Sequence, residues 1–268
     1  MRETRDIIRQ VVVAASAVIA VVGSFVGSGA AGGTPIQNAA GGALSATSTP
    51  IAPDTPAFSI WSVIYLGLIA YAVWQLLPGQ SGAERHRRLG YWVAASLVLN
   101  AAWILSIQFD LLPLSLPIIA VLLGVLGWAF ALCLRYRPTG TIDTLITDGT
   151  IGLYLGWVSI ATAANAAAVL TAEGFTGYGF SPDLWAVVVL AVAALVGLML
   201  AMVGHGRIAP ALSLAWGLVW VAVGRLSGEL HSTAAGIAAI VAAVVVLGSA
   251  VILRLINSRR LASGKALA

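Results

Sequence analysis

The sequence predicts an all-α, polytopic membrane protein with about eight transmembrane helices, and three observations support this fold class. The 268-residue chain is 60% hydrophobic and only 9% charged, with a mean hydropathy of +0.98, which excludes an ordinary soluble domain with a charged surface. Eight apolar runs, each roughly 20 residues long as a bilayer-spanning helix requires, lie between polar breaks. Basic residues collect on alternate connections between these runs.

The eight predicted spans are unbroken apolar stretches, which favours helices over the alternating strands of a membrane barrel. They cover residues 7–30, 57–78, 89–108, 112–134, 149–171, 184–204, 208–225 and 233–255. The fourth span begins around Pro113 and Pro117, where proline is tolerated because first-turn amides lack intrahelical partners. Gly23 and Gly27 in the first span form a small-residue surface that favours close helix packing and would also support a homodimer.

The distribution of positive charge predicts the orientation of the protein. Of the 14 basic residues, only Arg225 falls on the connections opposite the basic ones. We therefore expect an integral protein of the plasma (inner) membrane with both termini in the cytoplasm. The pI of 9.6 then reflects this topology and predicts no nucleic-acid partner. On the outer side, Arg225 and Glu229 are expected to form a solvated ion pair.

Two outer connections have distinctive compositions. Residues 32–56 are rich in Gly, Ala, Ser, Thr and Pro, with Asp54 as the only charge. They predict an extended loop without regular structure that either caps a cavity or is a flexible linker. The second connection, residues 172–183, carries aromatic residues typical of anchoring at the membrane interface: Phe175, Tyr178 and Phe180.

Three predicted spans carry aromatic or amide side chains well inside the membrane, and helical spacing places those of each span on one face. They are Trp61 and Tyr65 in the second span, Asn100 and Trp103 in the third, and Tyr154, Trp157, Ala161 and Asn165 in the fifth. An unpartnered amide in hydrocarbon costs on the order of a few kcal/mol, so the three faces are expected to meet. The asparagines would then serve as hydrogen-bonding links between helices, or the faces would surround a pocket.

The same residues resemble successive motifs of the TspO/MBR family (tryptophan-rich sensory protein, translocator protein), in the family's order. The motifs are FVGS from Phe25, W-x-x-x-Y from Trp61, LNAAW from Leu99 and YLGWVSIATAAN from Tyr154. The resemblance covers about residues 7–171 and implies a five-helix core around a cavity for porphyrins, sterol-like and other hydrophobic ligands, covered by the first long loop. It also implies the positions of the site residues: Trp61, Asn100, Trp103, Trp157 and Ala161 would line the cavity, with Tyr65, Tyr154 and Asn165 close by.

This resemblance divides the chain into a TspO-like core at residues 1–171, an external loop at 172–183, three additional transmembrane helices at 184–256 and a cytoplasmic tail at 257–268. The stretch TPIAPDTPAF before the second span departs from the family, which usually has a tryptophan followed by paired prolines there. The use of the three additional helices is left open by the resemblance.

The titratable residues give no support for catalysis. All ten carboxylates map to span ends or connections, and the three histidines lie in or beside connections, so neither a metal site nor a haem-ligating histidine nor a nucleophile–base pair is predicted. Asp110 is expected to cap the fourth helix, and the lone Cys133 to be a small apolar filler.

The expected function is the binding of a hydrophobic ligand, such as a porphyrin or other tetrapyrrole or a sterol-like molecule, for sensing, sequestration or transport. No cofactor is required. Two alternatives stay open: a membrane enzyme acting on an isoprenoid or porphyrin, and a non-catalytic scaffold subunit.

Overall fold

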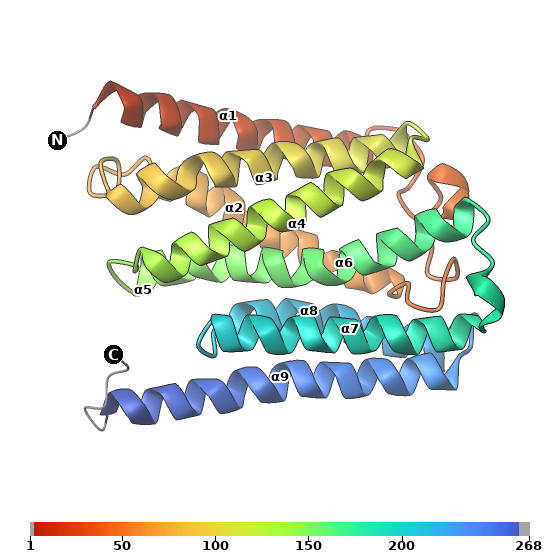
Figure 1. Ribbon diagram of the computed structural model, residues 1–268. Coiled ribbons are helices and arrows are strands. Elements are labelled where there is room, and N and C mark those ends of the chain that lie inside the picture. The colour runs from red at the N-terminus through yellow and green to blue at the C-terminus, as the bar shows by residue number, and fades with distance from the viewer. Residues whose placement is uncertain (1–2, 263–268) are drawn as a thin grey trace.

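The computed structural model describes residues 3–262 and confirms the all-helical fold class, with no strand among those residues. Eight helical segments are long and apolar enough to cross a membrane. They are built on α1 (Thr4–Gly27), α2 (Ile60–Trp74), α3 (Glu84–Gln108), α4 (Leu112–Arg135), α6 (Thr150–Ala172), α7 (Pro182–Val203), α8 (Ile208–Leu226) and α9 (Thr233–Ala262). α1 begins and α9 ends at the same end of the molecule (Figure 1).

Short helical elements lie between these spans. The segment before α6 consists of α5 (Thr141–Asp143) and a π-helical stretch, η3 (Thr144–Gly149). The long connection from α1 to α2 contains two 3-10 turns, η1 (Ala40–Gly42) and η2 (Thr55–Ser59). A further turn, η4 (Gly177–Gly179), precedes α7. The prediction of a loop without regular structure between the first two spans is therefore wrong at these two short turns.

Helix boundaries differ from the predicted ones mainly where a polar turn extends an apolar span. α3 begins at Glu84, ahead of the predicted residue 89, because the basic stretch ERHRR is also helical. α9 continues to Ala262, so residues 257–262 of the predicted tail are helical and residues 263–268 lie outside the described part of the chain. Asp110 does not cap α4: its backbone is left-handed (φ 57°), and the N-cap position is Leu111.

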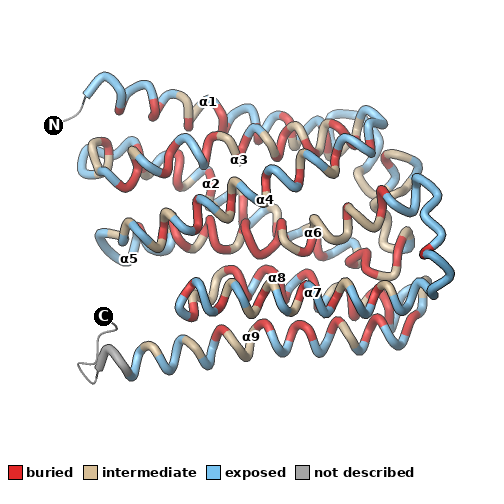
Figure 2. The backbone as a smooth tube through the Cα atoms, in the orientation of Figure 1, coloured by how far each residue is buried: buried red, intermediate tan, exposed pale blue. Residues whose placement is uncertain are grey.

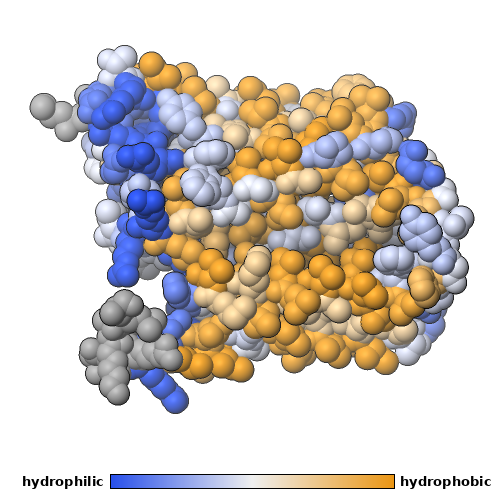
Figure 3. Space-filling model, in the orientation of Figure 1, coloured by the Kyte–Doolittle hydropathy of each residue, from blue (hydrophilic) through white to orange (hydrophobic). Residues whose placement is uncertain are grey.

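The outer faces of the helices form an apolar belt. Buried residues face the inside of the bundle while exposed ones face outward (Figure 2), and the exposed surface along the helices is predominantly hydrophobic (Figure 3). Hydrophilic side chains gather at the end where α1 begins, which we call the arginine-rich end because it carries Arg5, Arg88 and Arg254. The opposite end, which carries the connection between α1 and α2, is called the loop end. This surface pattern fits a helical bundle surrounded by lipid.

Buried ion pairs join the helices at the arginine-rich end. Asp6 of α1 bonds to Arg87 of α3 at 2.7 Å, and Asp148 of η3 pairs with Arg85 of α3 and, at 2.8 Å, with Arg207 at the start of α8. Asp6 and Asp148 are 1% and 5% exposed. The paired residues are far apart in the sequence, and helical periodicity relates only residues within one helix. The sequence therefore identified these carboxylates only as groups near the ends of spans.

α6 and α8 pack so closely that their backbones touch. A Cβ atom added at Gly156 would overlap the carbonyl oxygen of Pro210, and one at Gly152 would lie 2.8 Å from the Cβ of Ala209. α8 also packs along α9, which contacts α7. The three C-terminal helices therefore form one packed body with the first five.

The small-residue surface of α1 is used within the chain. A Cβ added at Gly23 would lie 2.9 Å from the Cβ of Ala101, and one at Gly27 would lie 2.7 Å from Cγ2 of Ile104. Both neighbours belong to α3, so these glycines permit the close packing of α1 on α3 that the sequence predicted.

Candidate functional site

The aromatic residues predicted from three separate spans come together in the structure. Trp61 of α2 is the centre of the cluster, with its ring centroid 5.6 Å from that of Tyr65 and 5.8 Å from that of Tyr154. The indoles of Trp157 and Trp103 lie 6.2 and 6.4 Å away. These separations are typical of favourable edge-to-face and tilted ring contacts. The expected meeting of the three faces is confirmed, and we call these five residues the aromatic cluster.

Both asparagines link helices at the rim of this cluster. The indole Nε1 of Trp103 donates to Oδ1 of Asn165 at 3.1 Å, and Nδ2 of Asn165 donates to Oγ of Ser115 in α4 at 2.9 Å. Asn100 donates to the phenol oxygen of Tyr65. The interpretation of the amides as links between helices is therefore confirmed. Ser115 was missed because one serine in an apolar span gives no signal of its partner.

The two remaining hydroxyls of the YLGWVSIATAAN motif lie outside the cluster. Ser159 and Thr162 each donate to the backbone carbonyl four residues earlier in α6, at 2.8 and 2.7 Å. This is a common way for a hydroxyl to be satisfied inside a membrane helix. The motif thus contains two kinds of polar residue. Tyr154, Trp157 and Asn165 belong to the candidate site, whereas Ser159 and Thr162 bond within α6.

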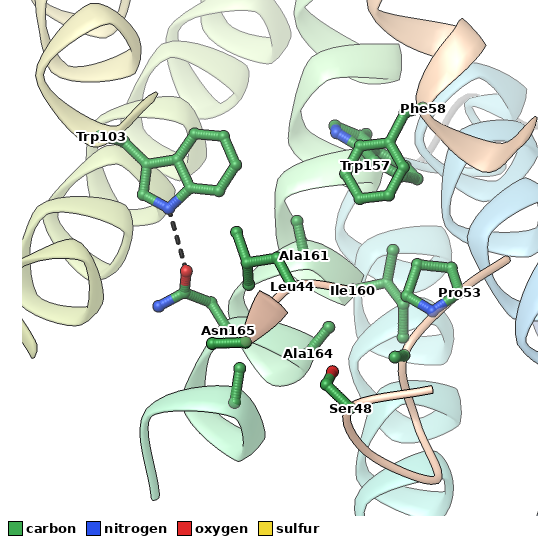
Figure 4. Close-up of a pocket in the computed structure, with 13 residues that line it drawn as sticks. Leu44, Ser48, Pro53, Phe58, Trp103, Trp157, Ile160, Ala161, Ala164 and Asn165 are labelled. Atoms are coloured by element: carbon green, nitrogen blue, oxygen red, sulfur yellow. Dashed lines mark hydrogen bonds between the residues drawn. The ribbon is translucent and has the colours of Figure 1, made fainter. Parts of the chain in front are cut away.

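A small cavity of about 30 Å³ lies beside the aromatic cluster, beneath the connection from α1 to α2 (Figure 4). Among the eight predicted site residues it is lined by Trp103, Trp157, Ala161 and Asn165. The other four are not among its lining residues. Trp61 packs against Trp103 and Trp157 of the wall, Tyr65 and Tyr154 pack against Trp61, and Asn100 bonds to Tyr65. The structure therefore brings all eight into one region but divides them into a cavity wall and its support.

The remaining wall of the cavity comes from residues that the sequence did not single out. They are Ala43, Leu44, Ser48, Ala52, Pro53, Phe58, Ile160, Ala164 and Ala168. Phe58 carried a signal, since it precedes Trp61 by three residues, and its ring lies 5.9 Å from that of Trp157 in an edge-on contact. The loop residues carried none, because the path of a loop has no periodicity to read.

The connection from α1 to α2 covers the cavity, so of the two interpretations left open for it, the cap is confirmed. We call residues 43–53 the cover. Ile51 and Ala52 are 3% and 5% exposed, which shows that the cover is packed into the protein. The cavity has room for a water molecule or two, because one water needs roughly 10–15 Å³ by this measure. Ligand pockets usually have about 300–1,000 Å³.

Two polar atoms in this closed site lack partners among the described residues. Nε1 of Trp157 is a buried donor without an acceptor, and Oδ1 of Asn100 is a buried acceptor without a donor. Trp157 itself lines the cavity and is 1% exposed. Buried polar groups are normally satisfied, so such exceptions call for an explanation.

α8 holds the cover in place through Arg225. The guanidinium donates to the backbone carbonyls of Thr49, at 3.1 Å, and of Ala46. Arg225 is 1% exposed, and no described carboxylate lies within ion-pair distance of it. The expected solvated pair with Glu229 is therefore wrong. The sequence correctly predicted that Arg225 lies at the end of a span. It could not predict the partners of Arg225, because these are backbone carbonyls, which every residue has.

Two tryptophans of α8 lie beneath the adjoining segment. Nε1 of Trp216 donates to the carbonyl of Ala57 at 2.9 Å, and the carbonyl of Trp220 accepts from the amide of Asp54 at 3.2 Å. Their rings contact each other at 5.6 Å. Neither residue lines the small cavity, so both tryptophans pack under the connection and do not extend the cavity.

Comparison with known proteins gives one family. The family model described as TSPO-like protein matches residues 12–252, from within α1 to near the end of α9. The match thus includes the three C-terminal helices, whereas the motif resemblance extended only to about residue 171. No curated protein and no solved structure matches the chain. With nearly its whole length matched, and with the motif residues gathered in one cluster, the chain belongs to the TSPO-like protein family.

Proposed function

We propose that this protein binds a hydrophobic ligand with a flat ring system, such as a porphyrin or a sterol-like molecule, against the aromatic cluster. The observation that carries the proposal is Trp157, which lines this mainly apolar cavity and whose Nε1 is a buried donor without a partner among the described residues. Aromatic walls with a few polar groups are what a mainly apolar ligand with polar edges requires. Membership of the TSPO-like family supports the same class of ligand.

Binding in this position requires the cover to move. A cavity of about 30 Å³ is an order of magnitude too small for such a ligand. The cover contributes Leu44, Ser48 and Pro53 to the cavity wall, so its displacement would enlarge the cavity directly (Figure 4). The protein would then sense, sequester or transport its ligand through the exchange between a covered and an open state.

Titration with protoporphyrin IX tests the proposal. We expect the double variant Trp61→Phe, Trp157→Phe to weaken binding about tenfold, because it removes indole surface and the free N–H donor. Binding is measured from the porphyrin absorption band with purified protein in detergent micelles, so the loss of tryptophan fluorescence does not affect the readout.

The matched control is Trp92→Phe, Trp128→Phe, since these two tryptophans also contact each other, at 6.2 Å, but are 39% and 54% exposed on the outer surface. Equal affinities of the two double variants would show that porphyrin binds elsewhere on the protein.

We also propose that the arginine-rich end faces the cytoplasm in the plasma (inner) membrane, with both termini on that side. The arginines gathered at this end, among them Arg5, Arg88 and Arg254, support this orientation. A cysteine placed at Tyr178, 83% exposed at the loop end, is expected to react with a membrane-impermeant maleimide in intact cells. A cysteine at Ser258, exposed at the other end, should react only after lysis. The native Cys133 is 1% exposed and contributes little background. The reverse labelling pattern would invert the orientation.

A further inference from the structure

A second and much larger cavity, of about 710 Å³, lies between α6 and α7 at the loop end. Its volume falls within the range of roughly 300–1,000 Å³ found for ligand pockets. α6 rises away from α7 toward this end (Figure 1), and the two helices contact each other far less than α7 contacts α9. The cavity is therefore a separation between two helices, partly closed by loops at the end of the bundle.

Small side chains on α6 create this space. Ala163, Ala166, Ala167 and Leu170 line the cavity and recur at intervals of three and four, so they share one face of α6. A different set of α6 residues, including Ala161 and Asn165, lines the small cavity beside the aromatic cluster. α6 is thus a wall between two cavities.

The opposite wall and the rim are apolar and aromatic. α7 contributes Trp185, Ala186 and Val189, and the connection between α6 and α7 contributes Phe175 and Phe180. None of the described residues that line this cavity carries a charge. Because burying an unpaired charge is costly, an uncharged and mainly apolar molecule fits this lining.

One lining group supplies a specific polar contact. Residues 47–51 of the cover also line the cavity, and among their hydroxyls that of Ser48 donates to the carbonyl of Ser45 at 2.8 Å. The hydroxyl Oγ1 of Thr49 is buried and has no hydrogen-bond partner among the described residues. Thr49 is 3% exposed, and its backbone carbonyl is held by Arg225. Thr49 lines the cavity, and a ligand whose polar group reaches Oγ1 would satisfy this hydroxyl.

We propose that the cavity between α6 and α7 is a second binding site, which takes an uncharged amphiphile with a long apolar body and a single hydroxyl or carbonyl group from the bilayer. Its polar group bonds to Oγ1 of Thr49, and its apolar body lies between the alanine face of α6 and the ring of Trp185. The site goes beyond the proposed binding at the aromatic cluster. The two cavities use different faces of α6 and share Ser48 of the cover.

The proposal is tested by photolabelling of the full-length protein in phosphatidylcholine vesicles with a diazirine-bearing derivative of hexadecanol. Labelled peptides are identified by mass spectrometry. We expect saturable labelling of residues 163–171 and 182–189, displaced by unlabelled hexadecanol. Hexadecane, which lacks the hydroxyl, and palmitate, which is charged, should displace the probe about tenfold less well.

Two variants locate the site. Thr49→Val keeps the shape of the side chain and is expected to weaken displacement by hexadecanol about fivefold to tenfold while displacement by hexadecane is unchanged. Ala163→Phe, Ala167→Phe fills the cavity and should abolish saturable labelling. Val192→Phe is the matched control, since Val192 is a 53% exposed residue of α7 outside the cavity lining.

Non-saturable labelling that is equally strong on the outer face of α9 would show contact with bulk lipid only and would overturn the proposal. Hexadecanol and hexadecane displacing the probe equally from the native protein would also overturn it, even if the doubly filled variant failed to fold. Thr49→Val is expected to leave porphyrin binding unchanged, because Thr49 does not line the cavity beside the aromatic cluster. The titration and the photolabelling are separate measurements, so failure of the first leaves the result of the second unaffected.

Discussion

Replacing Arg225 by methionine is expected to release the cover from α8 and to speed amide hydrogen exchange in residues 43–53 about 100-fold. The guanidinium donates to two carbonyls of this segment, those of Thr49 and Ala46. Hydrogen bonds from a charged donor contribute roughly 1.5–3 kcal/mol each, so loss of both costs about 3 kcal/mol of local stability. Methionine fills similar space but donates no hydrogen bond. Exchange is measured by mass spectrometry on the protein in detergent, with the α3 peptides as the internal reference.

Arg254→Met is the control for this experiment, because Arg254 is an exposed arginine at the other end of the bundle. It should leave exchange in residues 43–53 unchanged. If Arg225→Met also leaves that exchange unchanged, the cover is held by its apolar contacts and Arg225 does not secure it.

Replacing Gly156 by valine is expected to produce the largest loss of global stability. The added side chain would overlap the carbonyl oxygen of Pro210, a backbone atom that cannot move without the whole of α8. Overpacking of this kind costs typically about 1–3 kcal/mol, and an immovable backbone neighbour puts the variant at or above the upper end of that range. Separation of α6 from α8 would also withdraw Arg225 from the cover. The midpoint of thermal unfolding in detergent measures the effect.

Gly127→Val is the matched control, since Gly127 is a helical glycine of α4 with no atom within 4 Å of an added Cβ. Both substitutions introduce the same β-branched side chain into a helix, so the difference between their unfolding midpoints isolates the contact with Pro210. Similar midpoints would mean that α6 and α8 can separate at little cost.

Helical periodicity made the aromatic cluster predictable from sequence. Trp61 and Tyr65 share one face of their helix because of their spacing, as do Tyr154 and Trp157. Placing an unpartnered amide in lipid is costly, so helix faces that carry amides are expected to pack against one another. The same reasoning predicted the span count, because lipid imposes a minimum length on each apolar helix. Both inferences depend only on the local geometry of a helix and on the preference of apolar residues for lipid, and both can be read from the residues of one span.

The closure of the site was not predictable by the same means. The cavity is small because residues 43–53 take a particular path across it, and that path depends on carbonyl groups bonded to Arg225. Every residue has the same backbone carbonyl, so a sequence does not show which of them a buried guanidinium will reach. Arg225 was instead paired with Glu229 because the two are close in sequence.

The tether from Arg225 also decides how the chain can be shortened. It starts on α8, and two further hydrogen bonds of the same helix support the neighbouring segment: the indole of Trp216 donates to the carbonyl of Ala57, and the carbonyl of Trp220 accepts from the amide of Asp54. A fragment ending after the fifth membrane-spanning helix would keep the aromatic residues but would lose every one of these supports. The smallest part of this protein that keeps the cover closed over the site is therefore expected to include α8, and an excised five-helix fragment would have a more exposed site than the whole chain.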